Sequence, residues 1–274
     1  PYTMGNSLGF NASGETDGGL GVAVYYELDD DVMDDYDMTI SGDFGSIKFA
    51  GSGGSTAFGA VDDVTPTAYG ESWDILSATL DNGGNTGTNI FNSIGSAGSN
   101  NMFQYKSGDL VDGFAISASY VPSDGTTQVE SSVDFAVEYS GMEGLTIGFA
   151  SGENNAEGAT NNTDNTTMYV KYAYGPVTVG YQQSESDATS ATNSDESDTF
   201  GISYQVTDDL SVSYNKHEYN DGAWTSDEEY TGVSASYTMG GITIAGHMNE
   251  VSNRGGDSTA ADVEGYELYL GFAF

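Results

Sequence analysis

The chain has no cysteine among its 274 residues. Disulfide bonds and thiolate catalysis are therefore excluded, together with most zinc sites, which depend on cysteine ligands. The composition is instead rich in Gly, Asn, Ser, Thr and Tyr and poor in Leu and Lys, which disfavours helices. The absence of cysteine leaves the cellular compartment open.

Basic residues are almost as rare as cysteine. Five Lys and Arg stand against 42 Asp and Glu, so the formal net charge is −37. Binding to nucleic acid or to an anionic membrane surface depends on cationic side chains, so this composition disfavours both. In a compact soluble protein such a charge would lower stability through self-repulsion. Polar loops and a water-filled interior accommodate it better, because salt and divalent cations screen it there.

The sequence also lacks an apolar run of 18 residues, so it has no membrane-spanning helix. Its dominant pattern is an alternation of period two, in segments of the length expected for tilted membrane strands. In one of these segments Leu20, Val22 and Val24 alternate with Gly21 and Ala23. The fifteen segments are 3–15, 20–28, 36–44, 46–51, 101–106, 113–121, 131–139, 145–151, 166–174, 176–183, 198–206, 210–219, 228–238, 242–251 and 263–274.

The connections between these segments alternate between two kinds. Short ones, such as 207–209 and 239–241, are Gly/Asp turns suited to hairpins. Long ones, such as 52–100 and 184–197, are rich in Asp, Asn, Ser, Thr and Gly. Short turns on one rim and long polar loops on the other are typical of an outer-membrane barrel. We therefore predict an all-β chain that forms a single transmembrane antiparallel β-barrel domain over 1–274.

The last residue, Phe274, ends the apolar face of the fifteenth segment. A terminal aromatic residue is typical of the strand that closes a bacterial outer-membrane barrel, and it places Phe274 at the periplasmic rim. If fifteen strands precede this end, Pro1 lies at the opposite, outer rim. Single-chain bacterial barrels have even strand numbers, so that both ends lie at the periplasmic rim. We therefore expect one further strand before Pro1 and sixteen in total. The alternative is an odd barrel closed by a parallel pair.

Two runs resemble general porins of the α-proteobacterial, Rhodobacter-like type: SGETDGGL at 13–20 and SGDFGSIKFAG at 41–51. The resemblance extends over about 7–51 and returns at the terminal phenylalanine. It implies a sixteen-stranded homotrimer in the outer membrane, surrounded by lipid and lipopolysaccharide, that passes small hydrophilic solutes by diffusion without a cofactor. It also implies that loop 52–100 folds inward and narrows the pore, with a short helix plausible at 71–80.

Charged residues of and beside that loop are the candidate pore constriction. Porins of this type set loop acids against a basic wall, but the only arginine here is Arg254, in a late loop. We therefore expect a cation-selective pore, unless the acids are only solvated loop charges. The candidates are Asp62, Asp63, Glu71 and Asp74 in the loop and Lys48 and Lys106 on the flanking strands.

Further charges fall on the polar face of the predicted strands and are assigned to the wall of the lumen. These residues are Glu27, Asp37, Asp43, Asp134, Glu138 and Lys171.

The run 29–35 is the densest group of acids in the sequence. Asp29, Asp30 and Asp31 could hold a structural Ca²⁺, which takes six to eight oxygen ligands. The run does not have EF-hand spacing, so a solvated outer loop is the other interpretation.

No catalytic motif supports an enzyme. The two histidines, His217 and His247, are accompanied by no cysteine. The alternative function is a non-conducting acidic cell-surface β protein, an adhesin or lattice protein, which would stay soluble without detergent. The sequence favours a porin.

Overall fold

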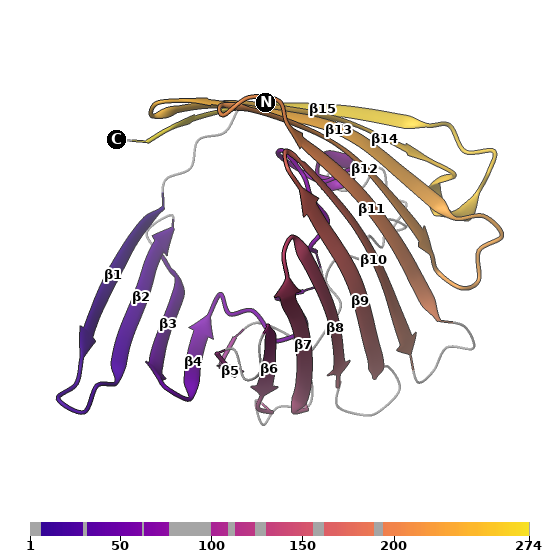
Figure 1. The fold of residues 1–274 in the computed structure, drawn as a ribbon. Coiled ribbons are helices and arrows are strands. Elements are labelled where there is room, and N and C mark those ends of the chain that lie inside the picture. The colour runs from indigo at the N-terminus through magenta and orange to yellow at the C-terminus, as the bar shows by residue number, and fades with distance from the viewer. Residues whose placement is uncertain are drawn as a thin grey trace. The chain divides into compact units, whose positions relative to one another are not determined.

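The computed structural model describes residues 7–29, 32–61, 63–76, 100–108, 113–123, 130–155, 162–188 and 194–273. These residues form one fifteen-stranded sheet in which each strand lies beside its neighbours in the sequence, from β1 to β15 (Figure 1). The paired strands run antiparallel. The all-β prediction is therefore confirmed. Within the described ranges, no helix has the length and apolar character needed to cross a membrane.

Each of the fifteen predicted segments overlaps one strand. The strands are β1 (Leu8–Glu15), β2 (Gly21–Asp29), β3 (Val32–Gly42), β4 (Gly45–Ser52), β5 (Met102–Lys106), β6 (Phe114–Val121), β7 (Ser132–Met142), β8 (Leu145–Asn154), β9 (Thr163–Tyr174), β10 (Val177–Ala188), β11 (Asp195–Gln205), β12 (Leu210–Asn220), β13 (Glu228–Met239), β14 (Ile242–Ser252) and β15 (Val263–Phe272). A short 3₁₀ helix, η2 (Arg254–Gly256), precedes β15.

Several strands extend further toward the long loops than the sequence predicts. Strand β10 reaches Ala188. The alternation of apolar residues, by contrast, already ends near 183. The ladder continues there through polar pairs such as Ser184 with Ser197 and Glu185 with Glu196. Backbone pairing does not require apolar side chains, so hydropathy marks only the apolar part of each strand.

The short turns on the other side contain glycines whose backbone conformation other residues rarely adopt. Gly45, the first residue of β4, has φ +100°, and Gly144, between β7 and β8, has φ +76°. A Cβ at Gly45 would lie 2.2 Å from the carbonyl oxygen of Lys106. Both positive φ and lack of space therefore require glycine at this turn.

The described residues divide into two compact units. The first lies within Pro1–Val61, Ile94–Gly141 and Gly148–Thr166, and the second within Asp62–Ser93, Met142–Ile147 and Thr167–Phe274.

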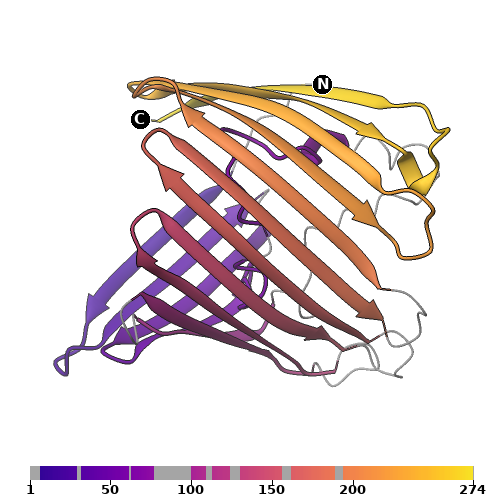
Figure 2. The ribbon, with the colours of Figure 1, turned by 45° about the vertical axis from the view of Figure 1, so that its right-hand side comes forward.

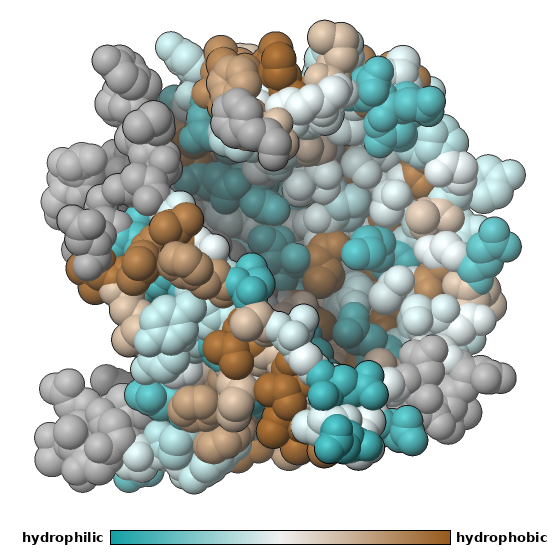
Figure 3. Space-filling view, turned by 90° about the vertical axis from the view of Figure 1, so that its left-hand side faces the viewer, coloured by the Kyte–Doolittle hydropathy of each residue, from teal (hydrophilic) through white to brown (hydrophobic). Residues whose placement is uncertain are grey.

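The two faces of the sheet have opposite character in each unit. On the polar face Asp134, Thr167 and Asn215 are almost completely buried. On the apolar face Tyr266 and Leu268 are 83% and 78% exposed. Hydrophobic and hydrophilic side chains gather in separate areas of the surface (Figure 3). Buried polar and exposed apolar side chains reverse the pattern of a water-soluble protein, so the apolar face is suited to a lipid environment.

Candidate pore constriction

Within the second unit, residues 63–76 cross the polar face of strands β10–β15 (Figures 1 and 2). The segment has little regular structure of its own, so its backbone groups need other partners. Polar side chains of the strands supply them, and one tyrosine of the segment adds a further bond. The hydrogen bonds run from Val64 N to Gln182 Oε1 (3.1 Å), Asn215 Nδ2 to Pro66 O (3.2 Å), Ala68 N to Ser213 Oγ (3.0 Å), Tyr69 N to Ser234 Oγ (3.1 Å), Asn249 Nδ2 to Glu71 O (2.9 Å) and Tyr69 OH to Glu267 Oε1 (2.5 Å).

Glycines on the strands leave room for this segment. A Cβ at Gly180 would lie 2.6 Å from Cδ of Pro66, and one at Gly232 would lie 2.9 Å from Cα of Ser72. Contacts this short require the segment to move. The glycines on its path are Gly180 in β10, Gly201 in β11, Gly232 in β13 and Gly265 in β15.

An apolar cluster anchors the end of the segment. Trp73 and Leu76 are buried against Tyr230 of β13 and Val251 of β14. The Trp73 ring also lies 4.7 Å from the His217 ring, measured between centroids. Burial of two such side chains contributes about 1.5–3 kcal/mol each, which is more than one of the hydrogen bonds contributes at about 0.5–1.5 kcal/mol.

The preceding part of the long loop packs on the polar face of the first unit. Ala57 and Phe58 are fully buried, and the Ala57 amide donates to Ser119 Oγ of β6 at 2.9 Å. Thr56 Oγ1 accepts from the Gly59 amide at 3.0 Å and closes a turn. The inward packing predicted for loop 52–100 is therefore present in both described parts of that loop.

Three predicted constriction acids, Asp63, Glu71 and Asp74, lie on the docked segment. The Glu71 amide donates to Asp74 Oδ2 at 2.9 Å. Desolvation and the charge of Asp74 raise the pKa of Asp63 to about 6. Desolvation, the charge of Asp63 and contact with Asp74 raise the pKa of Glu71 to about 8. Asp63 keeps an exposed surface, but neighbouring protein atoms displace part of its hydration shell. The ionisation of Asp63 therefore depends on the charge of Asp74, and that of Glu71 depends on the charges of Asp63 and Asp74.

The two predicted constriction lysines lie on adjacent strands of the first unit. In the β4–β5 ladder Lys48 pairs with Gln104, and Lys106 pairs with Ser46, so both lysines occupy the polar face. Lys48 Nζ forms an ion pair with Asp37 at 2.8 Å, whereas Lys106 is exposed. The role of both lysines in a constriction stays a prediction.

The other predicted wall residues have mixed surroundings. Asp43 lies in the exposed turn between β3 and β4, whereas the others belong to strands and share the polar face with the residues above. Their role in lining a lumen stays a prediction. On this face Glu27 accepts from Tyr25 OH at 2.5 Å, Asp37 pairs with Lys48, Asp134 is fully buried, and Glu138 and Lys171 are partly buried.

Four predicted site residues lie outside the described residues: Asp30, Asp31, Asp62 and Phe274. Asp29 ends β2. The described part of the chain has no group of three or more acidic or histidine side chains arranged to hold a metal, and the calcium site stays a prediction. Of the helix expected at 71–80, residues 74–76 are helical, and 77–80 lie outside the described ranges.

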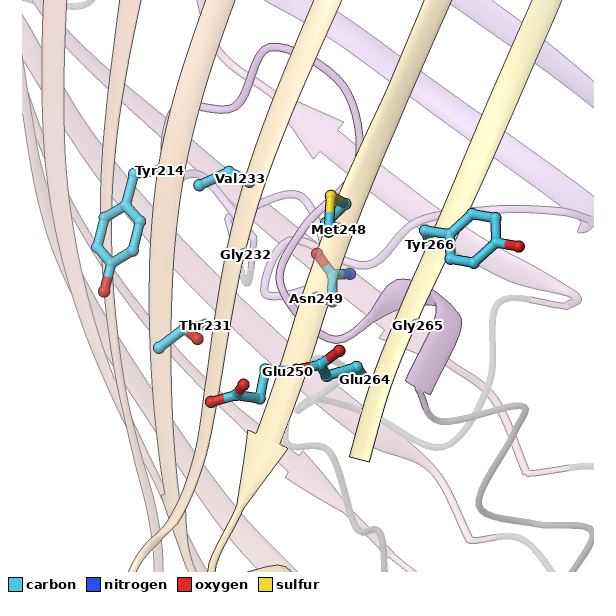
Figure 4. A pocket seen from close by; sticks show the side chains of 10 residues that line it. All are labelled: Tyr214, Thr231, Gly232, Val233, Met248, Asn249, Glu250, Glu264, Gly265 and Tyr266. Atoms are coloured by element: carbon cyan, nitrogen blue, oxygen red, sulfur yellow. The ribbon is translucent and has the colours of Figure 1, made fainter. Parts of the chain in front are cut away.

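A depression of about 330 Å³ lies on β12–β15, mainly among side chains of the apolar face (Figure 4). Glu250 and Glu264 stand directly opposite each other in the β14–β15 ladder, and both carboxylates lie at one end of the depression. Met248 and Tyr266 line its other side. Like charges directly opposite across a ladder repel, so this end of the strands is suited to a hydrated environment.

Sequence reasoning missed the residues that position the segment. They are Gln182, Ser213, Asn215, Ser234 and Asn249, together with the four glycines. A signal was present, because glycine inside a strand often marks the close approach of another backbone. These glycines share the face that the alternation assigns to polar residues.

A sheet with a lipid-suited face and an acidic segment packed on its polar face defines the class of outer-membrane channel proteins. The sequence profile of Gram-negative porins matches residues 2–256. The chain belongs to this family: it is an outer-membrane, non-enzymatic channel for passive diffusion. The family membership favours the channel over the non-conducting surface protein. No curated protein sequence matches the chain.

Solved structures with the same fold come from several bacteria. The anion-selective porin from Comamonas acidovorans has a TM-score of 0.69 and 16% identity, over 91% of this chain and 79% of that one. OmpT of Vibrio cholerae has a TM-score of 0.65 and 14% identity, over 97% and 88%. A mutant of the Rh. blastica porin has a TM-score of 0.61 and 17% identity, over 96% and 89%. These likenesses show the porin β-barrel fold.

Proposed function

We propose that this porin is a cation-selective diffusion channel for small hydrophilic solutes, narrowed by the infolded loop 52–100. The observation that carries the proposal is the placement of Asp63, Glu71 and Asp74 on a segment held against the polar face of β10–β15. The whole chain supplies only 5 basic residues, and Lys48 is already paired with Asp37. Acids fixed in a narrow aqueous passage attract cations and repel anions.

The reversal potential in a planar bilayer under a KCl gradient tests this proposal. We expect a potential of the sign set by K⁺ permeation, reduced when Asp63→Asn and Glu71→Gln are combined. Asp257→Asn removes a carboxylate outside the strands and outside the docked segment, and serves as the control. An anion-selective wild-type channel would contradict the proposal. If the double variant and the control gave the wild-type potential, the segment would not be the selectivity filter.

We further propose a homotrimer of the α-proteobacterial type, embedded among outer-membrane lipid and lipopolysaccharide. Support comes from the two hairpin runs at 13–20 and 41–51 and from the likeness to the Rh. blastica porin. Native mass spectrometry after mild detergent extraction would give three times the protomer mass, and a monomer mass would reject the assembly.

A further inference from the structure

A cavity of about 580 Å³ lies on the polar face of the first unit, lined by residues of strands β1–β4 and by Gly53. Its size falls within the range of about 300–1,000 Å³ usual for small-molecule sites. The polar lining consists of Asn11, Ser13, Tyr25, Asp35, Asp37 and Lys48.

The charges of this lining are unequal. Lys48 and Asp37 neutralise each other in a 2.8 Å ion pair. Asp35 forms no hydrogen bond or ion pair with another residue in the described part of the chain. The charges that act on it, from Asp34, Glu27 and Asp37, are all negative. The cavity therefore holds one carboxylate that lacks a positive partner.

The backbone beside Asp35 leaves room for its carboxylate. Gly53 lies directly against it, and a Cβ at this glycine would be 1.9 Å from Asp35 Oδ1. The φ of Gly53 is +66°, a conformation that glycine adopts most readily. The carboxylate thus occupies a space that any side chain at position 53 would fill.

Lys48 also lines the cavity and offers a cation to a ligand. The Lys48 side chain keeps 38% of its surface exposed despite the ion pair. Glu27 is not assigned to cation binding, because its carboxylate already accepts the hydrogen bond of Tyr25 OH at 2.5 Å. Asn11 and Ser13 add amide and hydroxyl groups from β1. A ligand with a cationic head and a separate carboxylate would complement both Asp35 and Lys48.

We propose that this cavity is a binding subsite for a basic amino acid. The ammonium or guanidinium of its side chain binds Asp35, and its α-carboxylate binds Lys48. The subsite rests on the proposed function in that the solute reaches the cavity through a cation-permeable pore. It goes beyond that function because a filter of fixed charges selects cations without binding any one solute at a defined site, whereas this cavity would bind one amino acid.

The test measures the block of K⁺ current through the full-length porin in planar bilayers. L-Arginine should reduce the current with saturation. L-Citrulline has the same shape but a neutral ureido group, and should bind at least about tenfold more weakly, as expected for the loss of one charge-assisted hydrogen bond. Equal block by both solutes would overturn the proposal.

Two variants with the same charge change locate the effect. Asp35→Asn should weaken the arginine block by about tenfold or more, whereas Asp34→Asn, one residue outside the cavity lining, should leave it unchanged. An equal weakening of the arginine block in both variants would show that the block depends only on the overall negative charge, and would overturn the subsite. The open-channel conductance of each variant confirms that it is folded. The reversal potential of the same channels, read without arginine, tests cation selectivity separately from the subsite.

Discussion

The side-chain amide of Asn249 donates a hydrogen bond to the backbone carbonyl of Glu71 at 2.9 Å. This contact joins strand β14 to the residue of the docked segment whose carboxyl pKa is raised to about 8. The position of a charge thus depends on a neutral side chain of the sheet, and perturbing that side chain should be visible at the segment.

Asn249→Ala should loosen the segment, because it removes a hydrogen bond with a net contribution of about 0.5–1.5 kcal/mol. Amide hydrogen exchange of Ala68 and Tyr69 should accelerate by about two- to tenfold. Ser236→Ala, a polar-face change in β13 that removes no hydrogen bond to the described part of the segment, is the control. Unchanged exchange in Asn249→Ala would show that the segment is held without this contact.

Gly232→Ala should displace the segment, because the added methyl group would lie 2.9 Å from Cα of Ser72 and 2.5 Å from Asn249 Oδ1. We expect a cost of about 1–3 kcal/mol from overpacking and a changed single-channel conductance. Gly14→Ala in β1 adds a methyl group with nothing within 4 Å and should conduct as the wild type does. Equal conductance in all three proteins would mean that the segment does not set the width of the pore.

Cation selectivity should rise with pH between about pH 5 and 9. The pKa values of Asp63 and Glu71 are raised to about 6 and about 8, so negative charge on the segment increases through this range. A raised carboxyl pKa stabilises the docked state fully below the ordinary pKa of the carboxyl, and this stabilisation is lost as the pH rises through the raised value. Docking should therefore be firmest in acid.

Reversal potentials and segment hydrogen exchange, the latter corrected for the intrinsic pH dependence, check both trends. The combination of Asp63→Asn and Glu71→Gln should flatten the two curves. A selectivity that falls as the pH rises would contradict the assignment.

Trp73 offers an optical report of docking, since the chain has only two tryptophans, Trp73 and Trp224. In a Trp224→Phe background, emission should be blue-shifted, because Trp73 is almost fully buried. Adding Leu76→Ala should cost about 2–5 kcal/mol and shift emission to the red. A blue-shifted spectrum in that double variant would show that Leu76 does not hold Trp73 in its site.

The sequence predicts the strands well because two solvents act on the two faces of each strand. Side chains such as Leu268 and Glu267 alternate in polarity wherever lipid lies on one side and water on the other. Where the side chains on both faces of a strand are polar, as around Ser184 and Glu185, the alternation ends although the ladder continues. Strand ends on the long-loop side were therefore underestimated.

The site was less predictable. The inward course of loop 52–100 came from a family resemblance, and no local pattern specifies which strands the loop crosses. That course depends on contacts between residues far apart in the sequence, such as Asn215 with Pro66. The raised pKa values of Asp63 and Glu71 arise only once the segment is folded, because they depend on the spacing of the acids and on lost hydration.

The small number of basic residues also affects the susceptibility of this porin to proteases that cleave after lysine or arginine. Lys48, Lys106, Lys171 and Lys216 all belong to strands, and Arg254 is the one basic residue outside them. A protease that cleaves after lysine or arginine therefore finds two candidate bonds that border or lie in the connections, Lys106–Ser107 at the end of β5 and Arg254–Gly255. Loops so rich in acid can lengthen and vary at the cell surface without offering such an enzyme further points of attack.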